Sequence, residues 1–191
     1  MDVLDVAARV ARALEEAGVG YFLGGSLASS LQGEPRSTND IDLVVALPED
    51  RVDTLVQALG PEFEVDAEAL RRAARERTSW NVFFLPLFTK IDLFVLRGDP
   101  FDASEFARRR PVEVRPGLSL AVKSPEDTIL RKLLWFRGGG EVSERQWRDV
   151  VEVLRQSGPG LDHAYLESWA ERLAVDDLLI RARGEAGPPR G

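Results

Sequence analysis

The sequence GGSLASSLQGEPRSTNDIDLVV, residues 24–45, joins a glycine turn to two aspartates that open an apolar run. The apolar residues after Asp42 predict a buried β-strand. Residues two apart on a strand point to the same face of a sheet, so Asp40 and Asp42 can present their carboxylates to one cation. Magnesium is usually held by one or two such carboxylates together with substrate phosphates. This stretch therefore indicates nucleotide chemistry.

The glycine pair and the helix that follows it are suited to phosphate binding. Residues 19–23 predict a short strand and residues 26–31 predict the helix that follows it, with the glycine pair between them. Glycine leaves room for a phosphate to approach the backbone. A helix start offers unpaired N–H groups, and Ser26 can cap the helix or donate its hydroxyl to phosphate. A plain turn with a serine cap is the alternative, but turn, helix, Arg36 and paired carboxylates together favour nucleotidyl transfer.

The order of these features resembles the signature of the DNA polymerase beta-like nucleotidyltransferase superfamily. In that superfamily a glycine-serine pair begins a helix, two aspartates lie on the next strand, and a third carboxylate comes from a later strand. The matching residue is Asp92, in the apolar run KIDLFVL, residues 90–96. A carboxylate in such a strand needs a metal, a cation or solvent as its partner. The alternative is that Asp92 pairs with Lys90, which lies on the same face of the strand.

The C-terminal third carries a second resemblance. The sequences KSPEDTILRKLL, residues 123–134, and RDV, residues 148–150, are similar to abortive-infection nucleotidyltransferases, which include toxins of toxin–antitoxin pairs. In those proteins a helical lysine and a later aspartate belong to the active site, and Lys132 and Asp149 are the matching residues. Both have structural alternatives: Lys132 as a solvated or salt-bridged helix residue, and Asp149 as part of an ordinary charged helix face.

The resemblance implies transfer of a nucleoside monophosphate from a nucleoside triphosphate such as ATP. Magnesium, or manganese in its place, would assist the transfer, and RNA such as tRNA or a protein would accept the nucleotide in a toxin–antitoxin or phage-defence system. The implied metal ligands are Asp40, Asp42 and Asp92, the implied catalytic residues are these three with Lys132, and the implied nucleotide-binding residues are Gly24, Gly25, Ser26, Arg36, Lys132 and Asp149.

Two other functions stay open from the sequence. Small antibiotic-modifying nucleotidyltransferases share the glycine turn and the paired aspartates, and the acid excess of this chain would permit a pocket for a cationic drug. An interaction or antitoxin module that keeps the fold without catalysis is the non-enzyme alternative. The predicted helical segment is short compared with larger abortive-infection toxins, so a partner protein or a homodimer would complete the acceptor site.

Composition limits the chemistry around this site. With 191 residues, 44% of them hydrophobic, the chain can bury one sizeable core or a core plus a small helical lobe. The absence of cysteine excludes disulfides and thiolate metal sites, and the single histidine, His163, leaves little room for zinc chemistry. A net charge of −7 argues against indiscriminate coating of nucleic acid. With no membrane span or signal peptide in the pattern, we expect a cytoplasmic protein.

The order of predicted elements indicates a mixed-sheet α/β core with flanking helices, over residues 1–122. Residues 123–184 predict a C-terminal helical lobe, and residues 185–191 a disordered tail. Residues 98–120 predict a connecting segment, with edge strands near 112–114 and 118–122. Arginine clusters at residues 71–77 and 108–110 are expected to be solvated surface or, alternatively, an acceptor-binding surface.

Overall fold

The computed structural model describes residues 1–35 and 38–187. The chain divides into two compact units, one of residues 1–27 and 37–122 and the other of residues 28–36 and 123–191. The first unit holds a seven-stranded mixed sheet with flanking helices, and helices make up the second, which confirms the predicted α/β class. Within the described ranges, no helix is both long and apolar enough to cross a membrane.

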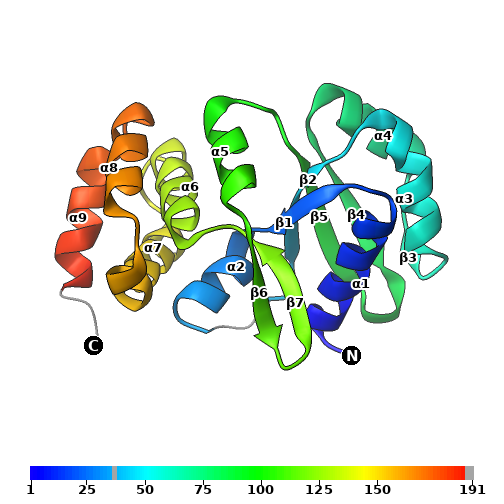
Figure 1. The fold of residues 1–191 in the computed structure, drawn as a ribbon, viewed down its shortest axis with the longest axis horizontal. Coiled ribbons are helices and arrows are strands. Elements are labelled where there is room, and N and C mark those ends of the chain that lie inside the picture. The colour runs from blue at the N-terminus through cyan, green and yellow to red at the C-terminus, as the bar shows by residue number, and fades with distance from the viewer. Residues whose placement is uncertain (36–37, 188–191) are drawn as a thin grey trace. The chain divides into compact units, whose positions relative to one another are not determined.

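The strands form one sheet in the order β3-β4-β5-β2-β1-β7-β6 (Figure 1). β2 runs parallel to β5 and β1 runs parallel to β7, whereas the other neighbours are antiparallel. The strands are β1 (Gly20–Leu23), β2 (Ile41–Ala46), β3 (Phe63–Glu64), β4 (Ser79–Phe84), β5 (Thr89–Val95), β6 (Arg110–Arg115) and β7 (Leu118–Val122).

The central strands bury one face and leave the other partly open. In β2 and β5 burial alternates residue by residue, as expected where one face of a sheet packs on a core. Ile41 pairs with Ile91 and Leu43 with Leu93, and all four side chains are buried on the core face. Asp42, between Ile41 and Leu43, therefore points to the opposite face, which carries the candidate site.

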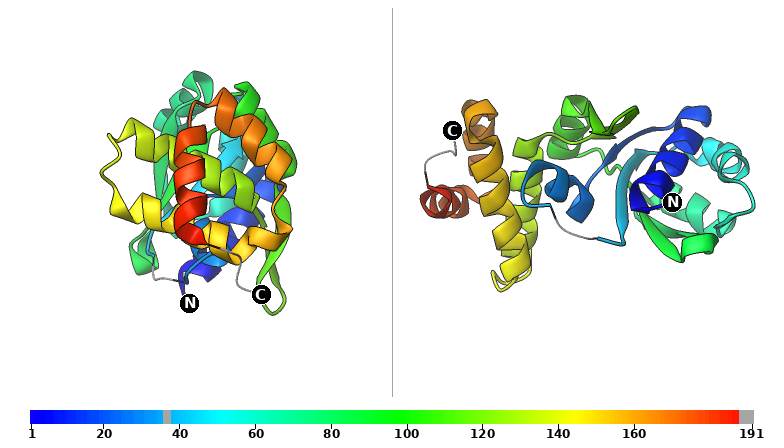
Figure 2. Two further views of the ribbon diagram at one scale, coloured as in Figure 1. Left: turned by 90° about the vertical axis from the view of Figure 1, so that its left-hand side faces the viewer. Right: turned by 90° about the horizontal axis from the view of Figure 1, so that it is seen from below.

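Helices of the first unit complete its core. They are α1 (Val3–Glu16), α3 (Val52–Leu59), α4 (Ala67–Glu76) and α5 (Pro100–Arg108). α1 begins with a capping box in which Asp2 and Asp5 each accept the other's backbone amide. Its buried stripe packs against α3, and α3 packs against α4, which in turn contacts β4. Figure 2 shows the blue helix α1 beside the cyan helix α3 in its right view.

Two features of the first unit differ from the sequence prediction. The segment 98–120 contains a helix, α5, which begins where the Asp99 side chain accepts backbone amides of the first turn and Pro100 occupies the first helical position. The prediction took the Gly98-Asp99-Pro100 sequence as a break, although it also starts a helix. β7 is not an edge strand, because it lies between β1 and β6.

The second unit is built from helices. α2 (Gly25–Gln32) spans the division between the units, which falls after Leu27. The remaining helices are α6 (Pro125–Gly138), α7 (Glu144–Ser157), α8 (His163–Arg172) and α9 (Asp176–Ala186). α9 runs past residue 185, so the predicted tail begins inside a helix, and residues 188–191 lie outside the described part of the chain.

Polar contacts between helices organise this unit. Gln32 on α2 donates to the backbone carbonyl of Lys123 over 2.6 Å and accepts from the hydroxyl of Thr128 on α6, also over 2.6 Å. On α8, Tyr165 donates its hydroxyl to the buried carboxylate of Asp127 over 2.7 Å. Because buried polar groups require hydrogen-bond partners, these contacts fix the packing of α2 and α8 on α6.

Candidate active site

Three polar residues form one row across the open face of the sheet. Asp42 on β2 is directly opposite Asp92 on β5, and Asp92 is directly opposite Asn81 on β4. Directly opposite residues on neighbouring strands point to the same face, with their Cβ atoms roughly 5 Å apart. The row therefore brings together Asp42 and Asp92, two of the predicted metal ligands.

Asp42 also meets the predicted glycine turn. The backbone amide of Gly24 donates to the carbonyl of Asp42 over 2.8 Å, and the backbone amide of Ser26 donates to its carboxylate. Gly25 has a φ of +55°, and a Cβ placed on it would overlap the Asp42 carboxylate. The turn thus needs glycine at position 25 for its backbone angle and for the close approach of Asp42.

The surroundings of Asp42 hold its pKa above the ordinary value of 3.8. Burial is the largest cause, and the charge of Asp92 is the next, with a further contribution from Asp40. The Ser26 amide and the charge of Lys90 lower the pKa, but less than those causes raise it. The site therefore contains like charges in a partly desolvated place, an arrangement that a bound cation would relieve.

Lys90 supplies a cation within the protein. Its ammonium lies 2.8 Å from the Asp92 carboxylate, and the Asp92 side chain is only 14% exposed. The hydrogen bond with Asp92 raises the pKa of Lys90. The structure thus contains the Asp92–Lys90 ion pair, which was the alternative to a metal-ligand role for Asp92. Asp92 also lies opposite Asp42, so the metal-ligand interpretation stays open.

The carboxylate oxygens of Asp40, Asp42 and Asp92 are suited to a hard metal ion, although these residues do not form a complete set of ligands. Asp40 is exposed and precedes β2, and its charge acts on Asp42. Over residues 1–35 and 38–187, no three Asp, Glu or His side chains are grouped closely enough to hold a metal. Magnesium often takes only one or two carboxylates and completes its shell with water and phosphate oxygens. The Asp42–Asp92 pair offers ligands of that kind.

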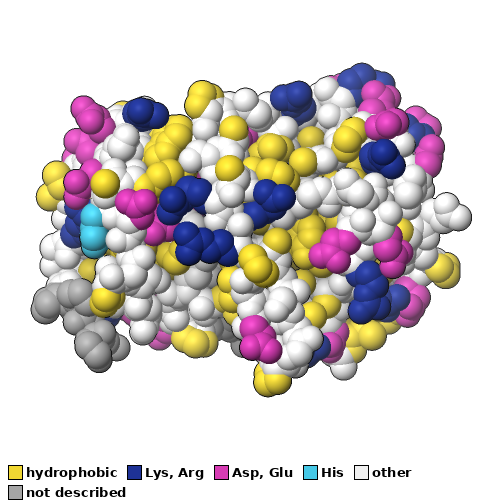
Figure 3. All heavy atoms as spheres, in the orientation of Figure 1, with side chains coloured by type: hydrophobic (Ala, Val, Ile, Leu, Met, Phe, Trp, Pro, Cys, Tyr) yellow, Lys and Arg dark blue, Asp and Glu magenta, His cyan; other side chains and the backbone are white. Residues whose placement is uncertain are grey.

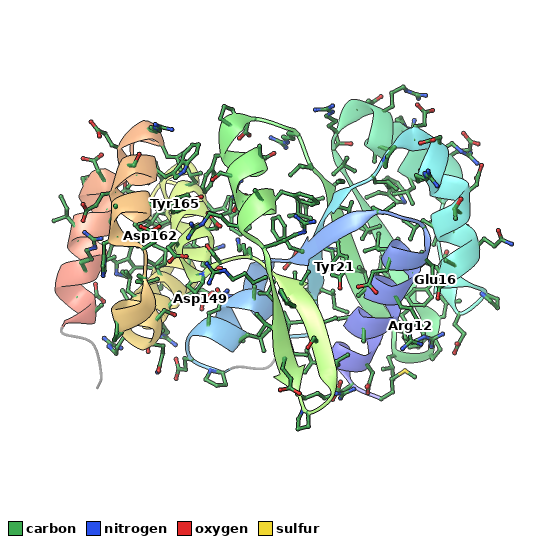
Figure 4. All side chains as sticks on the ribbon, in the orientation of Figure 1. Arg12, Glu16, Tyr21, Asp149, Asp162 and Tyr165 are labelled. Carbon is green, nitrogen blue, oxygen red and sulfur yellow. The ribbon has the colours of Figure 1, made fainter. Side chains whose placement is uncertain are left out.

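The second unit holds the other predicted pair, Lys132 and Asp149. The Lys132 ammonium lies 2.7 Å from the Asp149 carboxylate and 3.0 Å from the side-chain oxygen of Gln146. The Ser29 hydroxyl also donates to Asp149, over 3.3 Å. Lys132 is only 2% exposed and Asp149 10% exposed, so this is a buried ion pair between α6 and α7 (Figure 4). Roles of these residues toward a nucleotide remain predictions, and Arg36 lies outside the described residues.

In the first arginine cluster singled out in the sequence, residues 71–77, two arginines carry acidic partners, and in the second Arg109 lies over the ring of Phe106. Arg71 pairs with Asp53 and with Glu68, and Arg75 pairs with Glu49 over 3.0 Å. On the face drawn in Figure 3, basic and acidic side chains are likewise interspersed, with apolar side chains between them. These pairings support the interpretation of the first cluster as solvated surface rather than a surface for a polyanion.

Asn81 is the residue of the row that the sequence did not single out. The alternation in SWNVFF, residues 79–84, indicated a strand, but a strand alone does not say which residue stands opposite Asp92. Only the antiparallel register of β4 and β5 places the Asn81 amide there.

Comparisons with known proteins connect this geometry to a fold. An antigenic nucleotidyltransferase-like protein from Paracoccidioides brasiliensis is 18% identical, with a TM-score of 0.57, covering 99% of this chain and 94% of that one. The fold is that of a nucleotidyltransferase. The antibiotic-resistance factor ANT(2'')-Ia is 16% identical, with a TM-score of 0.55, covering 98% of this chain and 100% of that one.

A further structure of ANT(2'')-Ia, in complex with adenylyl-2''-tobramycin, is 17% identical with a TM-score of 0.56, over 90% of this chain and 96% of that one. No protein-family model matches the chain, and no curated protein matches it. At these identities the likeness establishes the nucleotidyltransferase fold, and the activity rests on the site itself.

Proposed function

We propose that this protein transfers a nucleoside monophosphate from a nucleoside triphosphate to a hydroxyl group, with the help of magnesium or manganese. The observation that carries the proposal is the placement of Asp42. This carboxylate lies opposite Asp92 and against the glycine turn that begins α2, within a nucleotidyltransferase fold. A carboxylate pair beside the start of a helix is suited to a metal-bound triphosphate.

Each residue of the site has a role in this reaction. Asp42 and Asp92, with Asp40 beside them, would hold the metal, which supplies positive charge against the phosphate oxygens when bound. The backbone of Gly24 and Gly25, with Ser26, would bind the triphosphate at the start of α2. The Ser26 amide, which donates to Asp42 in this structure, is a donor suited to a phosphate oxygen.

The bond changes follow from the proposed substrates. An acceptor hydroxyl oxygen attacks the α-phosphorus, the bond from that phosphorus to the bridging oxygen of the leaving group breaks, and pyrophosphate departs with the bonding electrons. In this proposal the hydroxyl proton passes to a carboxylate of the row, for which Asp92 is the candidate. Catalysis would come mainly from positioning and from electrostatic stabilisation.

The acceptor we propose is RNA such as tRNA, or a protein, in a toxin–antitoxin or phage-defence setting. This part rests on the resemblance of residues 123–134 and 148–150 to abortive-infection nucleotidyltransferases. In that proposal, Lys132 and Asp149 are the residues that would support nucleotide binding. Their buried ion pair would hold α6 and α7 in register, with Gln146 as a further partner.

One observation favours a second acceptor class. ANT(2'')-Ia, a solved structure with a similar fold, was crystallised with an adenylylated tobramycin. A small hydroxylated cation such as an aminoglycoside would also suit a site with three aspartates and one lysine in mutual electrostatic contact. A non-catalytic interaction module is the outcome if no triphosphate binds.

The test of the proposal is thermal stabilisation by each of the four ribonucleoside triphosphates, with and without magnesium. Wild type is compared with Asp42→Asn and with a matched control, Asp50→Asn, at an exposed aspartate of the first unit. We expect stabilisation that needs metal, is kept by the control and is lost in Asp42→Asn. Equal stabilisation of all three proteins, or of none, would contradict the proposal.

A further inference from the structure

One edge of the sheet is open beside the carboxylate row. β3 is the outermost strand on that side, but its two residues pair only with Phe83 and Phe84 of β4. In the part of the chain that the structure describes, no strand pairs with residues 79–82 on the side away from β5. Ser79, Trp80 and Asn81 are all exposed there. Half of β4 is therefore an edge strand.

The backbone groups of this edge can be assigned from the hydrogen bonds on either side of it. The amide of Leu85 donates to the carbonyl of Glu62, just before β3, over 3.0 Å. Backbone groups of a strand point alternately to its two neighbours, so Ser79 and Asn81 point the same way as Leu85. Their N–H and C=O groups face the open edge.

A second hydrogen bond gives the same assignment. The amide of Val95, at the end of β5, donates to the carbonyl of Thr78 over 2.9 Å. By alternation, the backbone groups of Trp80 and Val82 also face β5 and are used within the sheet. The open edge therefore offers two N–H and two C=O groups with the spacing of an extended chain, roughly 7 Å between alternate residues.

The sequence of β4 does not protect this edge. Exposed edges are usually blunted by charged residues, proline or a bulge, because they pair readily with another chain. The strand reads SWNVFF, with neither charge nor proline, and its pairing with β5 runs without a register shift. An unprotected edge of this kind is suited to strand addition by a polypeptide.

Charge and exposure indicate which polypeptide fits. On the face of the row, Glu64 stands opposite Phe83 and Asp92 stands opposite Asn81, with Lys90 as the neighbouring cation. Glu64 and Asp92 outnumber Lys90, which pairs with Asp92, and the exposed side chains of Phe83 and Phe94 lie on the same face. On the other face, Trp80 keeps 36% of its surface exposed. A docked strand alternates its side chains between these two faces.

We propose that the open edge of β4 binds an extended polypeptide segment by strand addition, with basic side chains toward the Asp92 face and apolar side chains toward Trp80. A second copy of this chain is the competing occupant, and the dependence of amide protection on protein concentration distinguishes it. The docked residue opposite Asn81 falls into the row of Asp92 and Asp42, two strand spacings, roughly 10 Å, from Asp92.

The test uses the whole chain and a synthetic peptide of alternating lysine and valine. Backbone amide exchange is measured by NMR with and without the peptide. In the free protein we expect fast exchange at Ser79 and Asn81 and slow exchange at Trp80 and Val82. The peptide should slow exchange at Ser79 and Asn81 alone. A glutamate–valine peptide and a proline-interrupted lysine–valine peptide are the controls, and neither should do so.

A matched pair of variants tests the backbone role. Ser79→Pro removes an outward N–H at the first residue of an edge strand, where proline is tolerated, whereas Ser79→Ala keeps that N–H. Peptide affinity should fall by at least roughly tenfold in Ser79→Pro and stay unchanged in Ser79→Ala. Thermal unfolding of each variant verifies that it is folded, and Ser79→Lys, which places a charge on the edge, is the second blocking variant.

Three results would overturn the inference. One is slow exchange of Ser79 and Asn81 without peptide, independent of protein concentration, since the chain itself would then cover the edge. Another is protection that grows with protein concentration, since a second copy would then be the occupant. The third is absence of binding, or equal binding to Ser79→Pro and Ser79→Ala. None of these readouts requires nucleotide, so failure here leaves the proposed transfer reaction untouched.

Discussion

The carboxylate of Asp42 accepts the backbone amide of Ser26, so a residue of β2 closes the first turn of α2. Gly25, the first residue of α2, makes this contact sterically feasible because it has no Cβ. An aspartate at a helix start is favoured by the helix dipole. Burial and the charge of Asp92 raise the pKa of the same carboxylate, whereas the Ser26 amide lowers it. The helix start therefore favours the anion, and the rest of the site favours the protonated form.

The first prediction concerns the charge of Asp42. Because its folded-state pKa lies above 3.8, the folded protein binds this proton more tightly than the unfolded chain does. This contribution to the free energy of unfolding is fully present below pH 3.8, and it is lost as the pH rises through the folded-state pKa of Asp42. Asp42→Asn should therefore raise the melting temperature at neutral pH in a chelator, by an amount that shrinks on acidification.

Thermal melts across the acid range check this prediction, with Asp50→Asn as the control for an exposed carboxylate. The asparagine side chain can still accept the Ser26 amide, so loss of that hydrogen bond is not expected. A variant less stable than wild type at neutral pH would show that Asp42 is stabilising as an anion without metal.

The second prediction concerns the glycine turn. Gly25→Ala forces a Cβ into the Asp42 carboxylate at a positive φ, and we expect a loss of about 1–3 kcal/mol in the free energy of unfolding. Gly24→Ala is the matched control, because a Cβ there would meet its nearest atoms at 3.8 and 4.0 Å. Denaturant melts measure both. Equal losses in the two variants would contradict the steric argument.

A double variant separates overlap from backbone strain. Asp42→Ala removes the carboxylate that the new methyl group would strike. The cost of Gly25→Ala should then be smaller than in the wild-type background, and the difference is the interaction energy of the two positions. Because the Cβ of residue 42 would still lie 2.7 Å from the new methyl group, an unchanged cost would assign the effect to the backbone angle together with this remaining contact.

The third prediction concerns the buried ion pair of the helical unit. Lys132→Met leaves the Asp149 carboxylate without its ammonium partner, and should cost about 3–5 kcal/mol of unfolding free energy. Adding Asp149→Leu should recover much of that loss, because no charge is then left buried alone. The exposed pair of Arg183 and Glu167 is the control, worth about 0–1 kcal/mol. A small loss in Lys132→Met would show that the pair is solvated in solution.

The fourth prediction concerns alkaline pH. Burial, the largest cause, raises the pKa of Tyr21, which is labelled in Figure 4, to about 12. The Tyr21 hydroxyl donates to Glu15 over 3.2 Å. The folded state thus favours the neutral phenol. This contribution to stability is present below pH 10.0 and is lost as pH rises toward about 12.

An NMR titration of ring-labelled tyrosine measures this pKa, and Tyr21→Phe assigns the signal, since Tyr165 is the only other tyrosine. Stability of the Tyr21→Phe variant should depend less steeply on pH in the alkaline range. A phenol that titrates near 10.0 in the folded protein would contradict the burial seen on β1.

Local patterns in the sequence were enough to predict most strands and helices, because apolar periodicity and caps act over a few residues. The glycine turn, Asp42 and Asp92 were found in this way, and the structure places them together. Asn81 was missed because its place in the row depends on strand register. Alternatives for Lys90 and Lys132 could not be decided either, since an ion pair depends on which distant side chain is brought near.

The parallel pairing of β2 with β5 also affects how the protein folds during its synthesis. Asp42 and Asp92 lie far apart along the chain, and two strands, two helices and their connections are made between them. Contacts of such long sequence separation form late and slowly in folding. During synthesis, the carboxylate pair cannot exist until β5 has left the ribosome and aligned with β2. A nascent chain that stops short of β5 would contain helices and some strands but not the Asp42–Asp92 pair.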